Sequence, residues 1–242
     1  MNQEPVALIT GGAKRIGAVI VKALHQSGYR VVIHYHRSEN EAQELANSLN
    51  EIRSNSAVTF SADLNQFDSF TNIVHQAFTV WRRLDVLVNN ASSFFPTAVG
   101  STTEAEWDDL INTNLKAPYF LAQAAAPHLK LHQGCIINIA DIHGKRPLKG
   151  YSVYSIAKAG LIMLTQTLAR ELAPAIRVNA IAPGITLLPE KTYPENFIEE
   201  MRQRTLLKHF PNPAEIAQAV LFLIQQPSIT AQTICIDAGR SI

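Results

Sequence analysis

The sequence contains very little cysteine and almost no net charge. Only two of its 242 residues are cysteines. Cys135 and Cys235 each lie inside an apolar run, so they argue against a disulfide framework and fit a reducing compartment. The formal net charge is +1, which provides no overall field to attract nucleic acid or an acidic membrane surface. We therefore expect neither of these partners.

The sequence also lacks a long uninterrupted apolar segment. No apolar run approaches the length of about 20 residues that a membrane-spanning helix needs. Residues 1–5 include no basic stretch ahead of the short apolar run that follows, so we see no signal peptide. We expect a soluble cytoplasmic protein with no membrane segment and no metal site.

The chain does contain a regular alternation of short apolar runs with longer helical segments. Apolar residues make up 47% of it and charged residues 17%, as in ordinary globular domains. The expected strands are 6–10, 30–35, 57–61, 84–88, 134–140, 174–180 and 233–236, and the longer expected helices are 39–53, 66–83, 104–131, 151–172 and 213–226. This pattern predicts one α/β domain over 1–242, doubly wound and Rossmann-like, with a parallel sheet of about seven strands.

A glycine-rich turn follows the first expected strand. It reads Thr10-Gly11-Gly12-Ala13-Lys14-Arg15-Ile16-Gly17 and leads into a helical pattern that continues to about Ser27. Glycines in such a turn let the backbone approach a pyrophosphate, and the helix N-terminus supplies N–H groups for the anion. A tight turn with no ligand explains the motif equally well when it is taken alone.

The residues after the second expected strand indicate which dinucleotide would bind. This position, about 20 residues past the glycine turn, is where a dinucleotide fold contacts the adenosine ribose. An acidic residue there would select NAD, but the sequence has His36, Arg37 and Ser38. Together with Arg15 these offer donors for a 2′-phosphate, so we predict NADP. The alternatives are that Arg37 is a solvated turn residue and that Glu39, close behind, favours NAD.

Four polar or aromatic residues at strand ends and in helices each have more than one interpretation. Asp63 could bond an adenine amino group or cap a helix beginning at Asn65. Phe94 and Phe95 could be local plugs or a stacking surface for a flat ligand. Asn114, inside the expected helix 104–131, could be a satisfied buried amide, a helix kink or part of a proton relay.

A tyrosine and a lysine share one face of the expected helix 151–172. Tyr154 and Lys158 are four residues apart, so the two side chains lie one above the other. The ammonium would favour the phenolate and lower the phenol pKa, which makes a proton donor usable near neutral pH. Asp141 comes directly after the expected strand 134–140 and would raise that pKa if it lies beside the phenol.

Taken together, motifs spread over nearly the whole chain resemble the short-chain dehydrogenase/reductase family. They occur in the family's order as Thr10-Gly11 to Gly17, Asn89-Asn90-Ala91, Asn114, Tyr154 with Lys158, and Pro183-Gly184. Two positions depart from the general family pattern. The middle glycine of the turn is replaced by Arg15, and the usual serine thirteen residues before the tyrosine is replaced by Asp141.

Both departures, with the runs 34–38 and 90–94, resemble the pteridine reductase subgroup. Its members use NADPH to reduce biopterin, dihydrobiopterin and folate-type pterins, and they are usually homotetramers. The resemblance implies cofactor binding by Gly11, Arg15, Ile16, Gly17, His36, Arg37, Ser38, Asp63, Leu64, Asn90, Ala91, Ser92, Tyr154, Lys158, Pro183 and Gly184. It implies substrate contacts by Ser92, Phe94, Asp141 and Tyr154, and catalysis by Asp141, Tyr154 and Lys158 with support from Asn114.

The chemistry of a pterin fits the aspartate. A pterin is reduced at ring C=N bonds and gains a proton at nitrogen, and a carboxyl beside Tyr154 can hold the phenol and pass a proton. Lys158 and the positive nicotinamide would offset the effect of Asp141 on the phenol. A loop and helix at about 185–208 would cover the substrate. The alternatives are a reductase of ketones, quinones or acyl thioesters on the same fold, and a non-catalytic protein that senses NADP.

Overall fold

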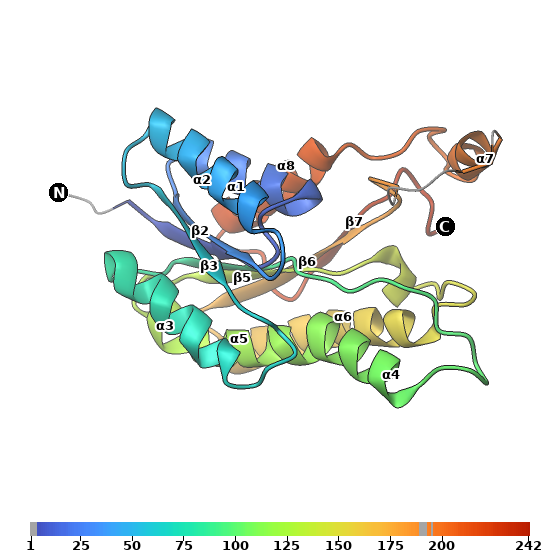
Figure 1. The fold of residues 1–242 in the computed structure, drawn as a ribbon, viewed down its shortest axis with the longest axis horizontal. Helices are drawn as coiled ribbons and strands as arrows, with labels where there is room; N and C mark the ends of the chain where they lie inside the picture. Colours follow the sequence, from blue (N-terminus) through green and yellow to red (C-terminus); the bar gives the residue numbers. More distant parts are fainter. Residues whose placement is uncertain (1–3, 189–192, 195) are drawn as a thin grey trace.

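Seven parallel strands form one sheet in the computed structural model, which describes residues 4–188, 193–194 and 196–242. The strand order is β3-β2-β1-β4-β5-β6-β7 (Figure 1). The strands are β1 (Val6–Ile9), β2 (Arg30–Tyr35), β3 (Ala57–Ser61), β4 (Val86–Asn89), β5 (Cys135–Ile139), β6 (Arg177–Pro183) and β7 (Thr233–Ile236). The predicted α/β fold with a parallel sheet of about seven strands is confirmed.

Helices cover both faces of this sheet (Figure 1). One face carries α1 (Arg15–Gln26), α2 (Glu39–Ile52) and α8 (Pro213–Gln225). The opposite face carries α3 (Ser69–Trp81), α5 (Ala117–Lys130) and α6 (Ser152–Leu172). Two short helices, α4 (Glu104–Ile111) and α7 (Phe197–Gln203), flank the carboxyl ends of the strands.

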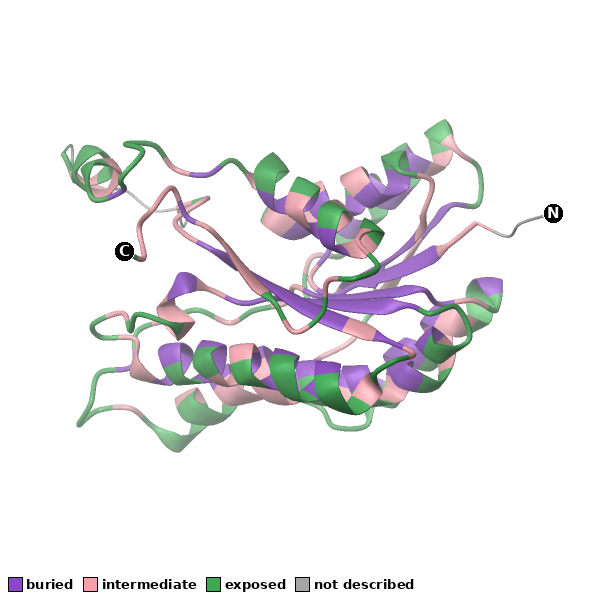
Figure 2. Cartoon of the chain, turned by 180° about the vertical axis from the view of Figure 1, so that it is seen from behind, coloured by how far each residue is buried: buried purple, intermediate pink, exposed green. Residues whose placement is uncertain are grey.

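The burial pattern explains why these sequences form strands and helices. All four residues of β1 and all five of β5 are buried, as expected for strands covered on both faces, and Figure 2 shows the sheet as the buried layer. In α8 the buried residues are Ile216, Ala217, Val220 and Leu223, spaced three and four apart on one helix face. Truncating a fully buried residue such as Leu87 to alanine would cost about 2–5 kcal/mol.

The strand order reverses between β1 and β4. β1 pairs with β2 on one side and with β4 on the other, so the connections leave in opposite directions at this point. In open α/β sheets the crevice beyond the carboxyl ends of the strands at such a reversal is where ligands bind. The glycine turn after β1 and the residues after β4 meet at this crevice.

The segment expected as one helix at 104–131 is divided by a π-helical turn. The turn η1 (Asn112–Lys116) joins α4 to α5, and its wider winding has two visible causes. The side chain of Asn114 donates through Nδ2 to the carbonyl of Leu110 (2.9 Å). Pro118 has no N–H to bond the carbonyl one turn earlier. A short 3₁₀ helix, η2 (Ile142–Gly144), was not predicted either.

No helix within the described residues is both long enough and apolar enough to cross a membrane.

Candidate active site

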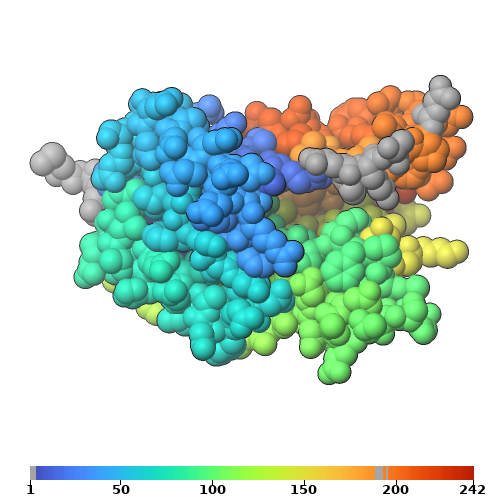
Figure 3. Space-filling view, in the orientation of Figure 1, coloured from blue at the N-terminus to red at the C-terminus, as the bar shows by residue number. Residues whose placement is uncertain are grey.

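A cavity of about 1000 Å³ runs along the carboxyl ends of the strands. The surface in Figure 3 is hollowed between the blue N-terminal segments and the orange C-terminal ones. Most residues that the sequence singled out line it, namely Gly11, Arg15, Ile16, Gly17, His36, Arg37, Asp63, Leu64, Asn90, Ala91, Ser92, Phe94, Asp141, Tyr154, Lys158, Pro183 and Gly184. Ser38 and Asn114 are not in the lining.

The glycine turn is held against β4 by close packing. Gly11 has φ +59°, and a Cβ on Gly17 would clash with the Gly11 carbonyl oxygen and lie 2.6 Å from Asn90 Nδ2. Asn90 donates through Nδ2 to the carbonyls of Thr10 (2.9 Å) and Gly11 (3.0 Å). Glycine at 17 therefore lets α1 approach the turn, and Asn90 fixes the turn to the end of β4.

Arg15 links the glycine turn to the segment after β6. It opens α1 with φ +52°, a left-handed conformation that suits the glycine found there in the general family. Its guanidinium donates to the carbonyls of Leu187 (2.8 Å) and Leu188 (3.3 Å). The side chain therefore contacts the loop that follows β6, rather than joining Arg37 at the end of β2.

The guanidinium of Arg37, after β2, is available to bind a ligand. Arg37 is exposed and makes no hydrogen bond or ion pair within the ranges that the structure describes. His36 lies nearby, with Nε2 3.9 Å from Asp63 Oδ2. Glu39 is the first residue of α2 and does not line the cavity, and Ser38 precedes that helix.

Asp63 does not cap the helix that follows it. Its Oδ1 accepts from the backbone N–H of Asn65 (2.9 Å), and α3 begins later, at Ser69. The capping alternative is therefore wrong, and the Asp63 side chain lines the cavity in a local turn.

His34 also lines the cavity, although the sequence predicted no site role for it beyond its place in the run 34–38. It is buried, with Nδ1 accepting from Gly11 N–H (3.2 Å) and Nε2 facing the Ala62 carbonyl (3.1 Å). Burial lowers the pKa of His34 to about 4, so the ring is neutral at physiological pH. A neutral ring that accepts at Nδ1 carries its hydrogen on Nε2, which assigns the donor to the Ala62 contact.

Tyr154 and Lys158, both buried, and the partly exposed Asp141 form a compact group where β5 ends and α6 begins. The hydroxyl of Tyr154 donates to Asp141 Oδ2 (2.8 Å), and Asp141 Oδ1 accepts from the backbone N–H of His143 (2.7 Å). Lys158 is 2% exposed, and its ammonium donates to the carbonyl of Ile139 (3.0 Å). The three residues are therefore brought together as the sequence predicted.

The expected lowering of the tyrosine pKa is wrong. Burial, followed by the negative charge of Asp141, raises the pKa of Tyr154 well above its ordinary value. The ammonium of Lys158 lies 5.6 Å from the centre of the phenol ring and does not reverse this. Burial also lowers the pKa of Lys158 to about 8, against the opposing effect of Asp141. Tyr154 is therefore protonated across the physiological range.

Asn114 positions Ser92 from inside the protein. It is fully buried in the π-helical turn and donates to the Ser93 carbonyl (3.0 Å), while its Oδ1 accepts from the Ser92 hydroxyl (2.6 Å). Each polar atom of the Asn114 side chain is thus bonded. The buried-amide interpretation is confirmed, the helix is interrupted by a π-helical turn at this residue, and the amide orients a serine at the cavity wall.

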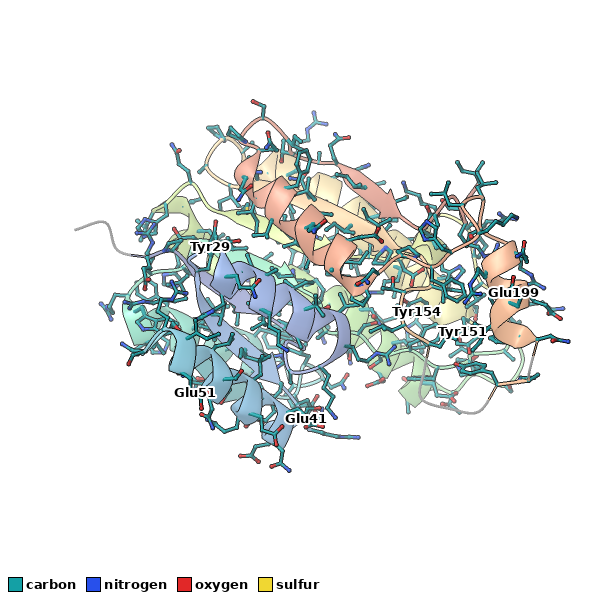
Figure 4. All side chains as sticks on the ribbon, turned by 90° about the horizontal axis from the view of Figure 1, so that it is seen from above. Tyr29, Glu41, Glu51, Tyr151, Tyr154 and Glu199 are labelled. Carbon is teal, nitrogen blue, oxygen red and sulfur yellow. The ribbon has the colours of Figure 1, made fainter. Side chains whose placement is uncertain are left out.

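The two adjacent phenylalanines have different environments. Phe95 packs against Leu110, Val153 and Tyr154, so it is the local plug. Phe94 is 45% exposed and lines the cavity, stacked on Tyr151 with ring centres 4.6 Å apart and edge-on to Tyr154 at 4.8 Å. Figure 4 shows Tyr151 and Tyr154 beside each other near α7.

Several lining residues were not predicted. They include Lys14, His34, Asn65, His143, Tyr151 and Arg240, whereas Tyr193, Phe197, Met201 and Arg204 fall in the expected covering segment 185–208 but were not singled out as site residues. The spacing of three between Tyr151 and Tyr154, on one helix face, was a usable signal. No pattern in the sequence indicates Arg240, because only the order of the strands brings the segment after β7 to the cavity. Within the expected covering segment 185–208, residues 189–192 and 195 lie outside the described part of the chain.

Comparisons with known proteins agree with this geometry. A family model described as enoyl-(acyl carrier protein) reductase matches residues 11–241. Pteridine reductase 1 of Leishmania tarentolae is 37% identical over 280 aligned residues, covering 98% of this chain and 96% of that protein. The 3-oxoacyl-[acyl-carrier-protein] reductase FabG of Staphylococcus epidermidis is 34% identical over 246 residues, covering 99% of each.

Proposed function

Because the chain belongs to the short-chain dehydrogenase/reductase family, we propose that it is an NADPH-dependent reductase of pterins, with dihydrobiopterin, biopterin or dihydrofolate as substrate. The observation that carries this proposal is the hydrogen bond from Tyr154 to Asp141 (2.8 Å). It places a carboxylate where the general family has a serine hydroxyl. The likeness to a pteridine reductase over nearly the whole chain supports the same substrate class.

The residues present fit a nicotinamide cofactor, which members of this family use. Lys158 is buried with one carbonyl partner, so two of its three N–H donors are free for ribose hydroxyls within the described part of the structure. The exposed guanidinium of Arg37 suits a 2′-phosphate and favours NADPH over NADH. When bound, the reduced cofactor supplies a hydride.

The buried group supplies the proton. The raised pKa of Tyr154 keeps its hydroxyl protonated, and a reduced ring nitrogen that is more basic than a phenolate can take that proton. Asp141 orients the hydroxyl by accepting its hydrogen bond. Its negative charge also favours a ring nitrogen that gains a proton, and Lys158 compensates the phenolate that remains.

A reductase of ketones or acyl thioesters is the second candidate. It is favoured by the family model and by the similarity to a 3-oxoacyl-[acyl-carrier-protein] reductase. Those substrates develop an oxyanion, which the carboxylate of Asp141 would repel. A non-catalytic NADP-binding protein is less consistent with the site, because it would have no use for a buried Tyr154 beside Lys158.

The deciding experiment follows NADPH oxidation with dihydrobiopterin, dihydrofolate, a ketone panel and an acetoacetyl thioester, and repeats each assay with NADH. We expect turnover with a pterin and NADPH. Tyr154→Phe should reduce kcat by about 10²–10⁴-fold while leaving NADPH affinity unchanged. Turnover of ketones or thioesters without any pterin turnover would replace the proposal by the second candidate.

We also propose a cytoplasmic homotetramer in which the segment 185–208 covers the substrate. Unpaired Cys135 and Cys235 fit the reducing cytoplasm. Partly exposed Tyr119, Ile156 and Met163 on α5 and α6 offer an apolar surface for subunit contacts. Light scattering should give four times the chain mass of 26.7 kDa, and a monomer mass would contradict the tetramer.

A further inference from the structure

Two arginines lie at one end of the cavity, beyond the catalytic group. Arg204 directly follows α7, and Arg240 lies in the turn after β7. Both line the same cavity as Tyr154 and Asp141. Neither guanidinium has a hydrogen bond or an ion pair among residues 4–188, 193–194 and 196–242.

Other arginines in this region have partners. Arg202, two residues before Arg204, pairs with Glu199 (2.6 Å), and Arg146 donates to the carbonyl of Ile242 (3.3 Å). Burial, followed by the charges of Arg204 and Arg146, lowers the pKa of Arg240. The positive charges are therefore close enough to repel one another, which an anion between them would relieve.

Acidic side chains in the described lining do not compensate this charge. Asp63 follows β3, and Asp109 of α4 lies beside the same segment, where its Oδ1 accepts from Asn65 (2.9 Å). Asp141 is occupied by Tyr154 and by the backbone N–H of His143. Asp237, near Arg240, accepts from the backbone N–H groups of Gly239 (3.1 Å) and Ser241 (2.7 Å) and does not line the cavity. Glu199 and Glu200 border a separate, smaller cavity beside Arg204. Among the described residues that line the large cavity, the end that holds Arg204 and Arg240 is therefore cationic.

The sheet order separates these arginines from the expected 2′-phosphate position. Arg37 follows β2 and Arg240 follows β7, with five strand spacings between them. At about 4.8 Å per spacing this is about 24 Å across the sheet, too far for one phosphate group to contact both. From β5, which delivers Asp141, to β7 there are two spacings, or about 10 Å.

The path between the catalytic group and the arginines is aromatic and apolar. Tyr193 and Phe197 line it as a stacked pair with ring centres 4.8 Å apart, and Met201 lies one helical turn further along α7. Such a wall suits a planar aromatic group. A three-carbon hydroxyalkyl chain spans only about 4 Å and would end short of the arginines.

We propose that Arg204 and Arg240 form a subsite for the carboxylates of an aminobenzoyl-glutamate substituent, so that the enzyme prefers a folate-type dihydropterin to one with a short neutral side chain. The inference rests on the proposed function. The pterin ring lies beside Tyr154, the aminobenzoyl ring lies along Tyr193 and Phe197, and the glutamate carboxylates reach the two guanidiniums.

The test compares kcat/KM for dihydrofolate with kcat/KM for dihydrobiopterin in the full-length enzyme. The wild type should favour dihydrofolate. Arg204→Ala and Arg240→Ala should each lower the ratio of the two values about tenfold, the scale of a charge-assisted hydrogen bond. Arg240→Lys should retain part of the preference. Arg202→Ala is the matched control, because its guanidinium is paired with Glu199 outside the cavity, and it should leave the ratio unchanged.

A second measurement needs no variant. Raising the salt concentration should reduce the wild-type preference for dihydrofolate, because added ions screen exposed charges. The inference is overturned, and the proposed function stands, if dihydrobiopterin is reduced but the ratio responds neither to salt nor to the loss of Arg204 and Arg240. If neither pterin is reduced, the proposed function and this inference fall together.

Discussion

Replacing Lys158 by methionine should abolish activity and yet stabilise the protein at neutral pH. The ammonium of Lys158 is 2% exposed and has one hydrogen bond, to the carbonyl of Ile139 (3.0 Å). Its pKa is lowered from 10.5 to about 8, mainly by burial. Keeping Lys158 charged in the folded protein therefore lowers the free energy of unfolding. Methionine has a similar length and carries no charge.

The size of the effect follows from the pKa. A drop from 10.5 to about 8 corresponds to about 3 kcal/mol. Loss of the hydrogen bond to Ile139 destabilises the variant by about 1 kcal/mol. The free energy of unfolding of Lys158→Met should therefore exceed that of the wild type by about 2 kcal/mol at pH 7. For a chain of 242 residues this raises Tm by about 4–8 °C.

The contribution of Lys158 to the free energy of unfolding changes with pH in a definite direction. Between pH 8 and 10.5 the unfolded chain still holds the Lys158 proton while the folded protein has lost it. The unfolded state then binds more protons, so this group makes the stability of the wild type rise with pH in that window. The variant lacks this rise, and its advantage should disappear as the pH approaches 10.5.

The assay is denaturant unfolding of both proteins across pH 7–10 without cofactor, with NADPH oxidation measured on the same samples. Lys22→Met, on the exposed side of α1, is the control and should leave both quantities near wild type. The reasoning would be refuted by a Lys158→Met variant that is less stable than the wild type at pH 7, with a difference that stays constant up to pH 10.

Three further changes, one of them with a control substitution, test other parts of the site. Arg37→Ala should raise KM for NADPH about tenfold and leave KM for NADH near wild type; an equal rise for both would place the 2′-phosphate elsewhere. Gly17→Ala should cost about 1–3 kcal/mol in unfolding free energy and weaken cofactor binding, because the added methyl meets the Gly11 carbonyl and Asn90. Gly28→Ala has open space around it, so it should cost only the penalty of its φ of +89° and keep normal cofactor binding. Asp141→Ser should lower the pKa of Tyr154 and so move the alkaline limb of the pH–rate profile to lower pH. If the limb does not move, it does not report the ionisation of Tyr154.

The sequence predicted the sheet well because local patterns determine it. Four-to-seven-residue apolar runs bounded by turn residues favour strands, and their alternation with helices implies parallel pairing. The ranges 30–35, 57–61 and 233–236 agree with β2, β3 and β7 residue for residue. The π-helical turn at Asn114 was not predictable as such, because it depends on where one amide finds its acceptor.

The site was predictable in its members but not in its electrostatics. Spacing alone places Tyr154 and Lys158 on one helix face. It says nothing of how deeply they are buried, and burial is the largest cause of both pKa shifts. The same limit applies to Arg15, whose two acceptors are main-chain carbonyls of Leu187 and Leu188 with no signature in the sequence.

The charge of Asp141 separates the two substrate classes that family membership leaves open. A unit charge about 4 Å from another contributes about 4 kcal/mol at the effective dielectric constant found near protein sites. The sign is unfavourable for the oxyanion that forms when a ketone or thioester carbonyl takes a hydride. It is favourable for a ring nitrogen that becomes protonated as its C=N bond is reduced. A serine at this position carries no charge, so the proposed preference for pterins over ketones and thioesters depends on Asp141.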